Sequence, residues 1–160
     1  MTASRAARRW LFKSEPETFS LADLARAKKP VPWDGVRNYQ ARNFLRDDAA
    51  PGDLVLFYHS SAEPPGVAGV AEIVRAGYPD PTQFRKGHDG FDPGSQPDAP
   101  RWIAVDLKHR ATFPTFVTRD ALAADPSAKT MDVLRRGNRL SIQPVTPAQF
   151  DAVLRLGGAG

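Results

Sequence analysis

The chain has 160 residues, of which 41% are hydrophobic and 25% charged, and its formal net charge is +4. This length and composition predict a single globular domain with a core of its own. The lack of cysteine excludes disulfides, thiolate metal sites and thiol nucleophiles, and it fits a cytoplasmic protein. No apolar run approaches the roughly 18 residues of a membrane span, and the basic N-terminus lacks the apolar segment of a signal peptide.

The N-terminal region begins with a basic stretch. We expect residues 1–9 to form a flexible arm and residues 10–12 to form a short strand, which ends before a Lys-Ser-Glu-Pro turn. Ser20, followed three residues later by Asp23, predicts a capped helix that ends near residue 27.

The middle of the chain contains its strongest strand signal. The spacing from Asn38 predicts a helix of about ten residues. The run LVLFYH at residues 54–59 predicts a strand that is buried on both faces. Small residues within 67–75 predict a strand that bends or closely approaches a neighbour. Residues 78–100 are rich in Pro, Gly and Asp and predict a long loop.

The C-terminal part predicts shorter elements. They are a strand at 101–110, helices at 119–124 and 127–136, a strand at 140–143, a helix at 147–156, and a flexible tail at 157–160. Strands separated by turns and short helices indicate a mixed α+β domain. The fold class that we predict is a bent mixed β-barrel or compact sheet with peripheral short helices.

Residues 31–61 combine aromatic, polar and basic side chains at high density. Trp33, Tyr39 and Tyr58 offer flat faces, while Asp34 and Asn38 can form hydrogen bonds. Such a combination is typical of a pocket for a nucleobase. Aromatic residues are commonly core residues, but these polar neighbours would be costly to bury without partners. The polar cluster Lys13-Ser14-Glu15 follows a predicted strand, and Glu15 can accept from an exocyclic amine as Asp34 can.

His59 ends the strongest strand, next to Ser60. One interpretation is a pocket-wall donor, and the other is a histidine whose hydrogen bonds are satisfied by backbone groups. The alternation of side chains along a strand argues against a dyad with Ser60. The three histidines lie far apart in sequence, so we expect no metal and no cofactor.

Arginines within and beside this region could bind the phosphate groups of a nucleic-acid backbone. We expect the phosphate-binding residues to be Arg37, Arg42, Arg46 and Arg139. Three classes of function stay open at this point: a reader of a modified base, an RNA-binding adaptor that discriminates no base, and an enzyme using Glu15, Asp34 or His59 as acid or base.

Several blocks of the chain resemble the EVE domain family. They are WLFKSEPETFSLADL, WDGVRNYQARNFL, GDLVLFYHS, GVAGVAEIV and RRGNRLSIQPVT, and they occur in the family's order across residues 10–156. The resemblance implies a single PUA-like domain over these residues, a bent β-barrel related to the YTH readers of methylated adenine. It also implies a non-catalytic pocket for a modified base, chiefly modified cytosine, in DNA or RNA.

The resemblance assigns the pocket to Lys13, Ser14, Glu15, Trp33, Asn38, Tyr39, Arg42, Tyr58, His59, Arg139 and Ser141, and Asp34 is added because of its own chemistry. The base-binding residues that we expect are Lys13, Ser14, Glu15, Trp33, Asp34, Asn38, Tyr39, Tyr58, His59 and Ser141. Lys13–Glu15 and Ser141 lie far from residues 33–59 in sequence, so they must close the pocket from the other side. We expect the partner to be DNA or RNA carrying a modified base, such as 5-methylcytosine or 5-hydroxymethylcytosine, and the protein to be a monomer without membrane contact.

Overall fold

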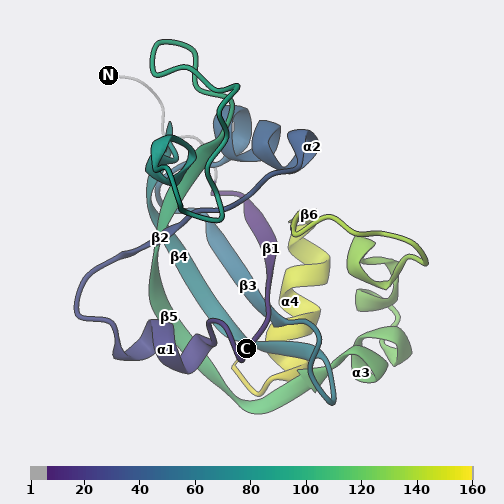
Figure 1. The fold of residues 1–160 in the computed structure, drawn as a ribbon. Helices are drawn as coiled ribbons and strands as arrows, with labels where there is room; N and C mark the ends of the chain where they lie inside the picture. The colour runs from purple at the N-terminus through teal and green to yellow at the C-terminus, as the bar shows by residue number, and fades with distance from the viewer. Residues whose placement is uncertain (1–6, 160) are drawn as a thin grey trace, which may run out of the picture.

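The computed structural model describes residues 7–159, which form one mixed sheet with short helices on both faces (Figure 1). Within this part of the chain the sheet has six strands, in the order β2-β5-β4-β3-β1-β6. Only β1 and β3 pair in parallel, and the other neighbours are antiparallel. The strands are β1 (Arg9–Ser14), β2 (Val31–Trp33), β3 (Leu54–His59), β4 (Gly66–Pro79), β5 (Ile103–Thr118) and β6 (Ile142–Val145).

Among residues 7–159, four short α-helices flank the sheet. They are α1 (Leu21–Arg26), α2 (Tyr39–Asn43), α3 (Arg119–Ala124) and α4 (Pro147–Leu156). A π-helical turn, Phe44–Asp48, continues α2, and 3-10 turns occur at Pro81–Phe84, Ala128–Thr130 and Asp132–Leu134. No helix among residues 7–159 is long and apolar enough to cross a membrane.

The two faces of the sheet bury two separate cores because side chains alternate along each strand. In β1, Trp10 and Phe12 pack with α1 and α2, whereas Leu11 packs with α3 and α4. In β3, Phe57 belongs to the first core and Tyr58 to the second. Strand β3 is therefore buried on both faces, as its unbroken apolar sequence predicts.

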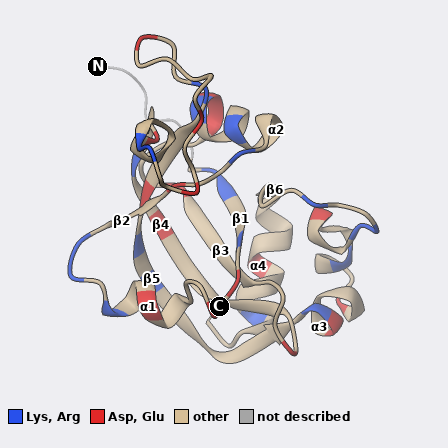
Figure 2. Ribbon diagram, viewed as in Figure 1, with Lys and Arg blue, Asp and Glu red and all other residues tan. Residues whose placement is uncertain are grey.

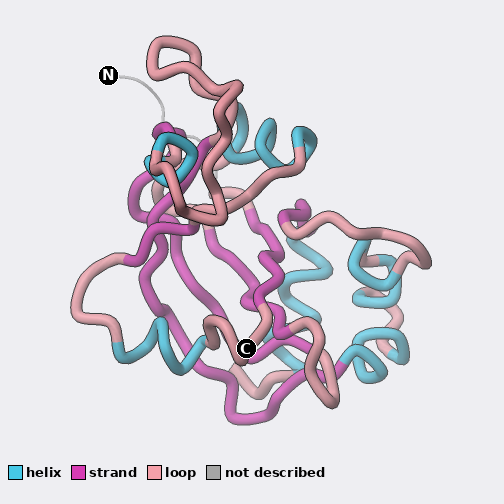
Figure 3. Tube along the Cα trace, in the orientation of Figure 1, coloured by secondary structure: helices cyan, strands magenta, loops and turns pink. Residues whose placement is uncertain are grey.

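Strands β4 and β5 are long, bent and irregular. Their pairing shifts register at four places, each marking a bulge or irregularity that lets the strands twist. Gly69 permits a close approach of the two strands, since a Cβ there would lie 2.2 Å from the carbonyl oxygen of Ala111. Both strands extend well beyond the ranges predicted from sequence, and Figure 3 shows them running the length of the sheet.

The mixed α+β class and the PUA-like architecture are confirmed, with a sheet that is bent but does not close into a barrel. Strands β2 and β6 stay at its two edges. The capping boxes also form as predicted: Ser20 and Asp23 at α1, and Thr146 and Gln149 at α4.

The helix predicted at 127–136 is wrong. The chain instead makes two 3-10 turns separated by Met131, whose backbone is extended. The Arg119 guanidinium donates to the carbonyl groups of Val133 (2.8 Å) and Leu134 (3.3 Å), which bind the side chain of a neighbouring element and do not act as helical acceptors. This segment therefore follows tertiary contacts and not its local pattern.

The sheet begins before residue 10. Strand β1 already starts at Arg9, and the Arg8 N–H donates to Asp53 Oδ1 (2.9 Å), so these two residues join the sheet. Residues 1–6 of the predicted arm lie outside the described residues. At the other end, Gly158 has φ of +77° and closes α4 in a Schellman arrangement with its neighbour Ala159. Only Gly160 of the predicted tail is not described.

Candidate functional site

A cavity of about 300 Å³ lies where the ends of β1 and β2 meet the segment before β6. We name it the Trp33 cavity. The backbone N–H of Lys13 donates to the carbonyl oxygen of Ser141 (2.9 Å), which joins two segments distant in sequence. The lining residues are Lys13, Ser14, Glu15, Thr18, Trp33, Asp34, Gly35, Val36, Arg37 and Ser141. Residues from both ends of the chain therefore line one cavity.

Trp33 is the fixed flat surface of this cavity. Its ring centroid lies 5.5 Å from those of Phe12 and Phe57, and it meets the Phe57 ring edge to face. The indole is half-buried, and it also lines a neighbouring cavity of about 360 Å³ together with Phe19 and Pro32. Trp33 thus lies between two hollows, held from one side by core rings.

Asp34 contributes a carboxylate with an altered affinity for protons. Burial of the group raises its pKa above the usual value, and the neighbouring Asp80 carboxylate raises it further. The residue is still exposed to solvent, so a ligand can reach it. A carboxylate accepts hydrogen bonds when ionised and donates one when protonated. Asp34 can therefore serve either role at the mouth of the cavity.

Asp80 holds the wall of the Trp33 cavity although it does not line it. Its fully buried carboxylate accepts from the Gly35 N–H (2.8 Å), from Arg37 Nη1 (2.9 Å) and from both the N–H and hydroxyl of Thr82. Burial acts to raise the pKa of Asp80, but the donors from Thr82, Gly35 and Arg37 together hold it below the usual range. This carboxylate fixes the backbone that follows Trp33.

Arg37 lines the cavity but has its donors engaged. Besides Asp80, the guanidinium donates to the Gly90 carbonyl (2.7 Å) and the Thr82 hydroxyl (3.0 Å), and it lies over the Trp102 ring. Arg37 therefore connects the cavity wall to the loop between β4 and β5. Because its donors form these contacts, the Arg37 side chain is not available to bind a phosphate group.

Helix α2 carries three predicted site residues outside the Trp33 cavity. The Asn38 side chain caps α2 by accepting from the Ala41 N–H (3.0 Å). Tyr39 is 53% exposed and stacks on Trp102 with a centroid distance of 4.9 Å. Arg42 lies over the Tyr39 ring and donates to the Arg101 carbonyl (2.6 Å). These residues form an exposed aromatic and basic surface beside the cavity.

Tyr58 and His59 do not line the Trp33 cavity. Tyr58 is buried in the core around α3 and α4, because it points to the opposite face of β3 from Phe57. His59 Nε2 accepts from the Leu21 N–H (3.2 Å) at the start of α1. Burial lowers the pKa of His59, which favours the neutral acceptor form. Of the two interpretations of His59, the geometry is that of a histidine satisfied by the backbone.

The remaining predicted arginines lie at the surface. Arg46 pairs with the adjacent Asp47 (2.7 Å), and Arg139 is exposed on the loop that leads to Ser141. Figure 2 shows basic residues on α2, on the loop between α1 and β2, and on the loop before β6. Positive charge therefore flanks the Trp33 cavity on several elements without forming one block.

Thr18 and the loop between β4 and β5 were missed as parts of the site. The loop is ordered by Gln83, whose buried amide donates to the carbonyl groups of Asp80 (2.7 Å) and Trp102 (2.9 Å). The stretch Asp80-Pro81-Thr82 carries a local signal, since Asp before Pro is a typical start of a helical turn. Among residues 7–159 no three His, Cys, Asp or Glu side chains group in a way that could hold a metal ion.

An open mixed sheet with an aromatic and polar cavity at the strand ends defines a PUA-like domain. The chain belongs to the EVE domain family, whose model matches residues 8–156. It is 43% identical to human thymocyte nuclear protein 1, over 92% of this chain and 72% of that protein.

Solved structures agree with this assignment. A Pseudomonas putida protein superimposes with a TM-score of 0.88 at 44% identity, covering 93% of this chain and 99% of that one. The human THYN1 protein, solved in complex with DNA containing 5-methylcytosine, superimposes with a TM-score of 0.85 at 43% identity. The coverage in that comparison is 94% of this chain and 98% of the human one.

Proposed function

We propose that this protein binds nucleic acid by taking a modified base, a modified cytosine, into the Trp33 cavity. The observation that carries the proposal is the position of Trp33, whose ring is held by two core aromatic rings while it lines the cavity. A rigid indole beside carboxylates provides both a stacking surface and hydrogen-bond acceptors. The role is binding and not catalysis.

The size of the cavity supports a ligand as small as one base. Its volume of about 300 Å³ lies at the lower end of the range of roughly 300–1,000 Å³ that small-molecule pockets occupy. A base inside a duplex cannot reach such a cavity, so it has to be flipped out or presented by a single strand. Stacking of the base on Trp33 would contribute about 1–3 kcal/mol.

Hydrogen bonds would then read the edge of the base. Asp34 or Glu15 can accept from the exocyclic amine of cytosine, as carboxylates do from cytosine N4. Asn38 is exposed beside this wall, and its side-chain oxygen already accepts from the helix. Arg42 and Arg139, exposed or half-exposed near the cavity, would hold the phosphate backbone.

The comparison with the human THYN1 protein supports the choice of ligand. That protein was solved with DNA containing 5-methylcytosine, and the solved chain is 43% identical to this chain, with coverage of 94% of this chain and 98% of the solved one. The same comparison supports a binding function over an enzymatic one. Turnover of an oligonucleotide, followed by mass spectrometry, would contradict the proposal.

The experiment compares the affinity of the wild type and of Trp33→Ala for strands that carry cytosine, 5-methylcytosine or 5-hydroxymethylcytosine at one position. We expect the wild type to prefer a modified strand, and the alanine variant to lose about tenfold or more of its affinity. Trp33→Phe, which retains a ring, serves as the matched control and should lose less.

RNA and DNA versions of the same strands distinguish the backbone that is bound. If affinity falls with salt concentration and is the same for modified and unmodified strands, the protein is instead an adaptor that recognises only the phosphate backbone. In that outcome Trp33→Ala would bind as well as the wild type, and the proposed reader function would be rejected.

A further inference from the structure

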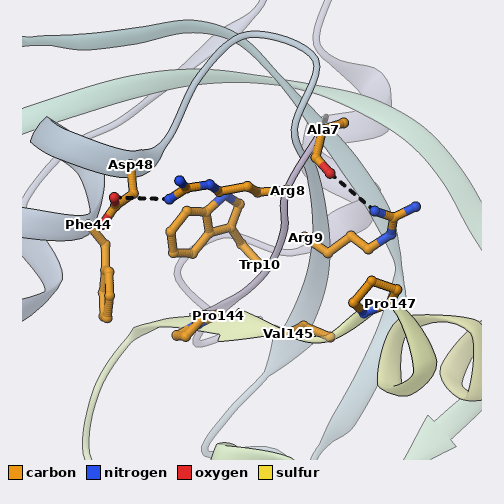
Figure 4. A pocket seen from close by; sticks show the side chains of 9 residues that line it. All are labelled: Ala7, Arg8, Arg9, Trp10, Phe44, Asp48, Pro144, Val145 and Pro147. Atoms are coloured by element: carbon orange, nitrogen blue, oxygen red, sulfur yellow. Dashed lines mark hydrogen bonds and ion pairs between the residues drawn. The ribbon is translucent and has the colours of Figure 1, made fainter. Parts of the chain in front are cut away.

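A second cavity, larger than the Trp33 cavity, lies at the opposite end of β1. Its volume is about 490 Å³, and Figure 4 shows Trp10 between Phe44 on one side and Arg9 on the other, with the Arg8 side chain reaching across Trp10 to Asp48. We name it the Trp10 cavity. Its lining residues are Ala7, Arg8, Arg9, Trp10, Phe44, Asp48, Pro144, Val145 and Pro147.

The same three segments of the chain line both cavities. Strand β1 contributes at both of its ends, the segment around β6 contributes Ser141 to one cavity and Pro144 to the other, and residues 33–48 contribute to both. Trp10 is paired with Pro144 in the sheet. Trp10 and Ser14 are four positions apart in β1, which corresponds to about 13 Å along the strand. For a nucleic-acid strand that stays stacked at about 3.4 Å per nucleotide, this distance corresponds to about four nucleotides.

The charge of the Trp10 cavity favours an anion. Arg8 Nη1 lies 2.9 Å from the Asp48 carboxylate, so these two charges offset each other at one wall. Arg9 supplies a further positive charge at the opposite wall, where its guanidinium lies 5.3 Å from the centre of the Phe150 ring and Nη1 donates to the Ala7 carbonyl (3.1 Å). The cavity therefore carries one positive charge in excess.

The Arg9 Nε atom is buried and has no hydrogen-bond partner among the described residues. Leaving a buried donor without an acceptor costs about 1–3 kcal/mol, and more for a charged group. A ligand acceptor at this wall would remove that cost once the Arg9 side chain turns to expose Nε. A phosphate oxygen suits this position because arginine forms strong charge-assisted hydrogen bonds with phosphate.

The rest of the lining is flat and apolar. Phe44 is half-buried and lies 5.5 Å from the Trp10 ring, at an angle of 57°. Pro144 and Pro147 are exposed at the opposite wall. Rings of this kind accept the face of a base without selecting its identity, because every base has such a face.

We propose that the Trp10 cavity is a second nucleotide subsite, which takes a nucleotide about four positions from the modified base on the same strand. Arg9 donates to its phosphate, and Phe44 with the two prolines contacts its base. The subsite adds affinity but does not discriminate between bases. This inference rests on the proposed function only for the register of the strand relative to the Trp33 cavity.

The test measures affinity for single strands of increasing length that carry one 5-methylcytosine, extended on one side or on the other. We expect the wild type to gain about tenfold in affinity when one particular side grows to about four nucleotides, and not when the opposite side grows. Arg9→Met keeps the packing on Phe150 but removes the donor, and Pro144→Trp fills the cavity from an exposed position. Both variants should lose the gain, and Arg9→Met should lower the salt slope by about one.

Lys129→Met is the matched control, because Lys129 is an exposed cation on a 3-10 turn beside α3. An undiminished gain in both variants would overturn the subsite, as would a gain that is equal on both sides. Preference for 5-methylcytosine over cytosine reports on the Trp33 cavity and should persist in Arg9→Met. If the wild type shows no preference for 5-methylcytosine but still gains affinity on one side, the proposed reader function is rejected and the subsite is retained.

Discussion

Asp80 and Arg37 form an ion pair with an N–O distance of 2.9 Å, in which the carboxylate is fully buried and the arginine side chain is 25% exposed. The pair connects the long loop after β4 to the wall of the Trp33 cavity, and the Gly35 N–H binds the same carboxylate oxygen. The position of the cavity wall therefore depends on a residue that lies 43 positions away from Arg37 in the chain.

Asp80→Asn should destabilise the protein by about 2–3 kcal/mol, because it leaves the Arg37 charge without its partner. Urea unfolding measures this loss, and Asp120→Asn, at an exposed position of α3, is the control. Since the pKa of Asp80 is lowered on folding, its contribution is present above about pH 4 and is lost as the pH falls below that value. A variant as stable as the wild type at pH 7 would contradict the role of Asp80.

Asp34→Asn should separate stability from binding. The raised pKa of Asp34 means that its charged form is disfavoured in the folded protein, so removing the charge should leave the melting temperature unchanged or slightly higher at pH 7. Affinity for a modified strand should fall, because the amide no longer offers two acceptors to the base.

The pH dependence gives a second check on Asp34. If the ionised carboxylate accepts from the base, wild-type affinity is full above the raised pKa of Asp34 and declines as the pH falls through it. The decline should be absent or smaller in Asp34→Asn. The same decline in both proteins would assign it to another group.

His59→Gln should reduce the dependence of stability on pH. Because the pKa of His59 is lowered on folding, its contribution is complete above about pH 6.5 and declines as the pH falls toward the lowered value. Glutamine can still accept from the Leu21 N–H but does not titrate. Thermal unfolding from pH 5 to pH 8 measures the effect, with His109→Gln as the control. Equal pH profiles for the wild type and His59→Gln would contradict this account.

Tyr39→Ala should weaken binding to modified and unmodified strands by the same factor. Its ring is exposed beside the Trp33 cavity and stacks on Trp102, so it can contact the strand without reading the base. We expect a loss of about fivefold to tenfold, and Tyr39→Phe should retain most of the affinity. A selective loss for the modified strand would place Tyr39 in base recognition.

Local patterns predicted the parts of the fold that depend on a few neighbouring residues. The caps at Ser20 and Thr146 satisfy backbone N–H groups within three residues, so their sequence signals suffice. The segment 127–136 was mispredicted because its carbonyl groups bind Arg119, a contact that no local pattern contains. The long loop after β4 is ordered by the same kind of distant partner.

The residues of the candidate site were predicted only in part, because some of their positions depend on contacts between distant segments. Trp33, Asp34 and the Lys13–Glu15 cluster line one cavity, as composition and the family resemblance together indicated. Tyr58 shares their chemistry, but one step along β3 directs it to the other core. Alternation alone separates Tyr58 from Phe57. It does not indicate which face of the sheet contains the cavity, and this follows only from the packing of Trp33 against Phe57.

A crystal structure of the protein with a short strand that carries one 5-methylcytosine tests the central claim most directly. The account predicts that the methylated base lies in the Trp33 cavity, stacked on the indole, with its exocyclic amine within hydrogen-bond distance of Asp34 or Glu15. A complex in which the protein contacts only phosphates and the cavity holds no base would contradict it.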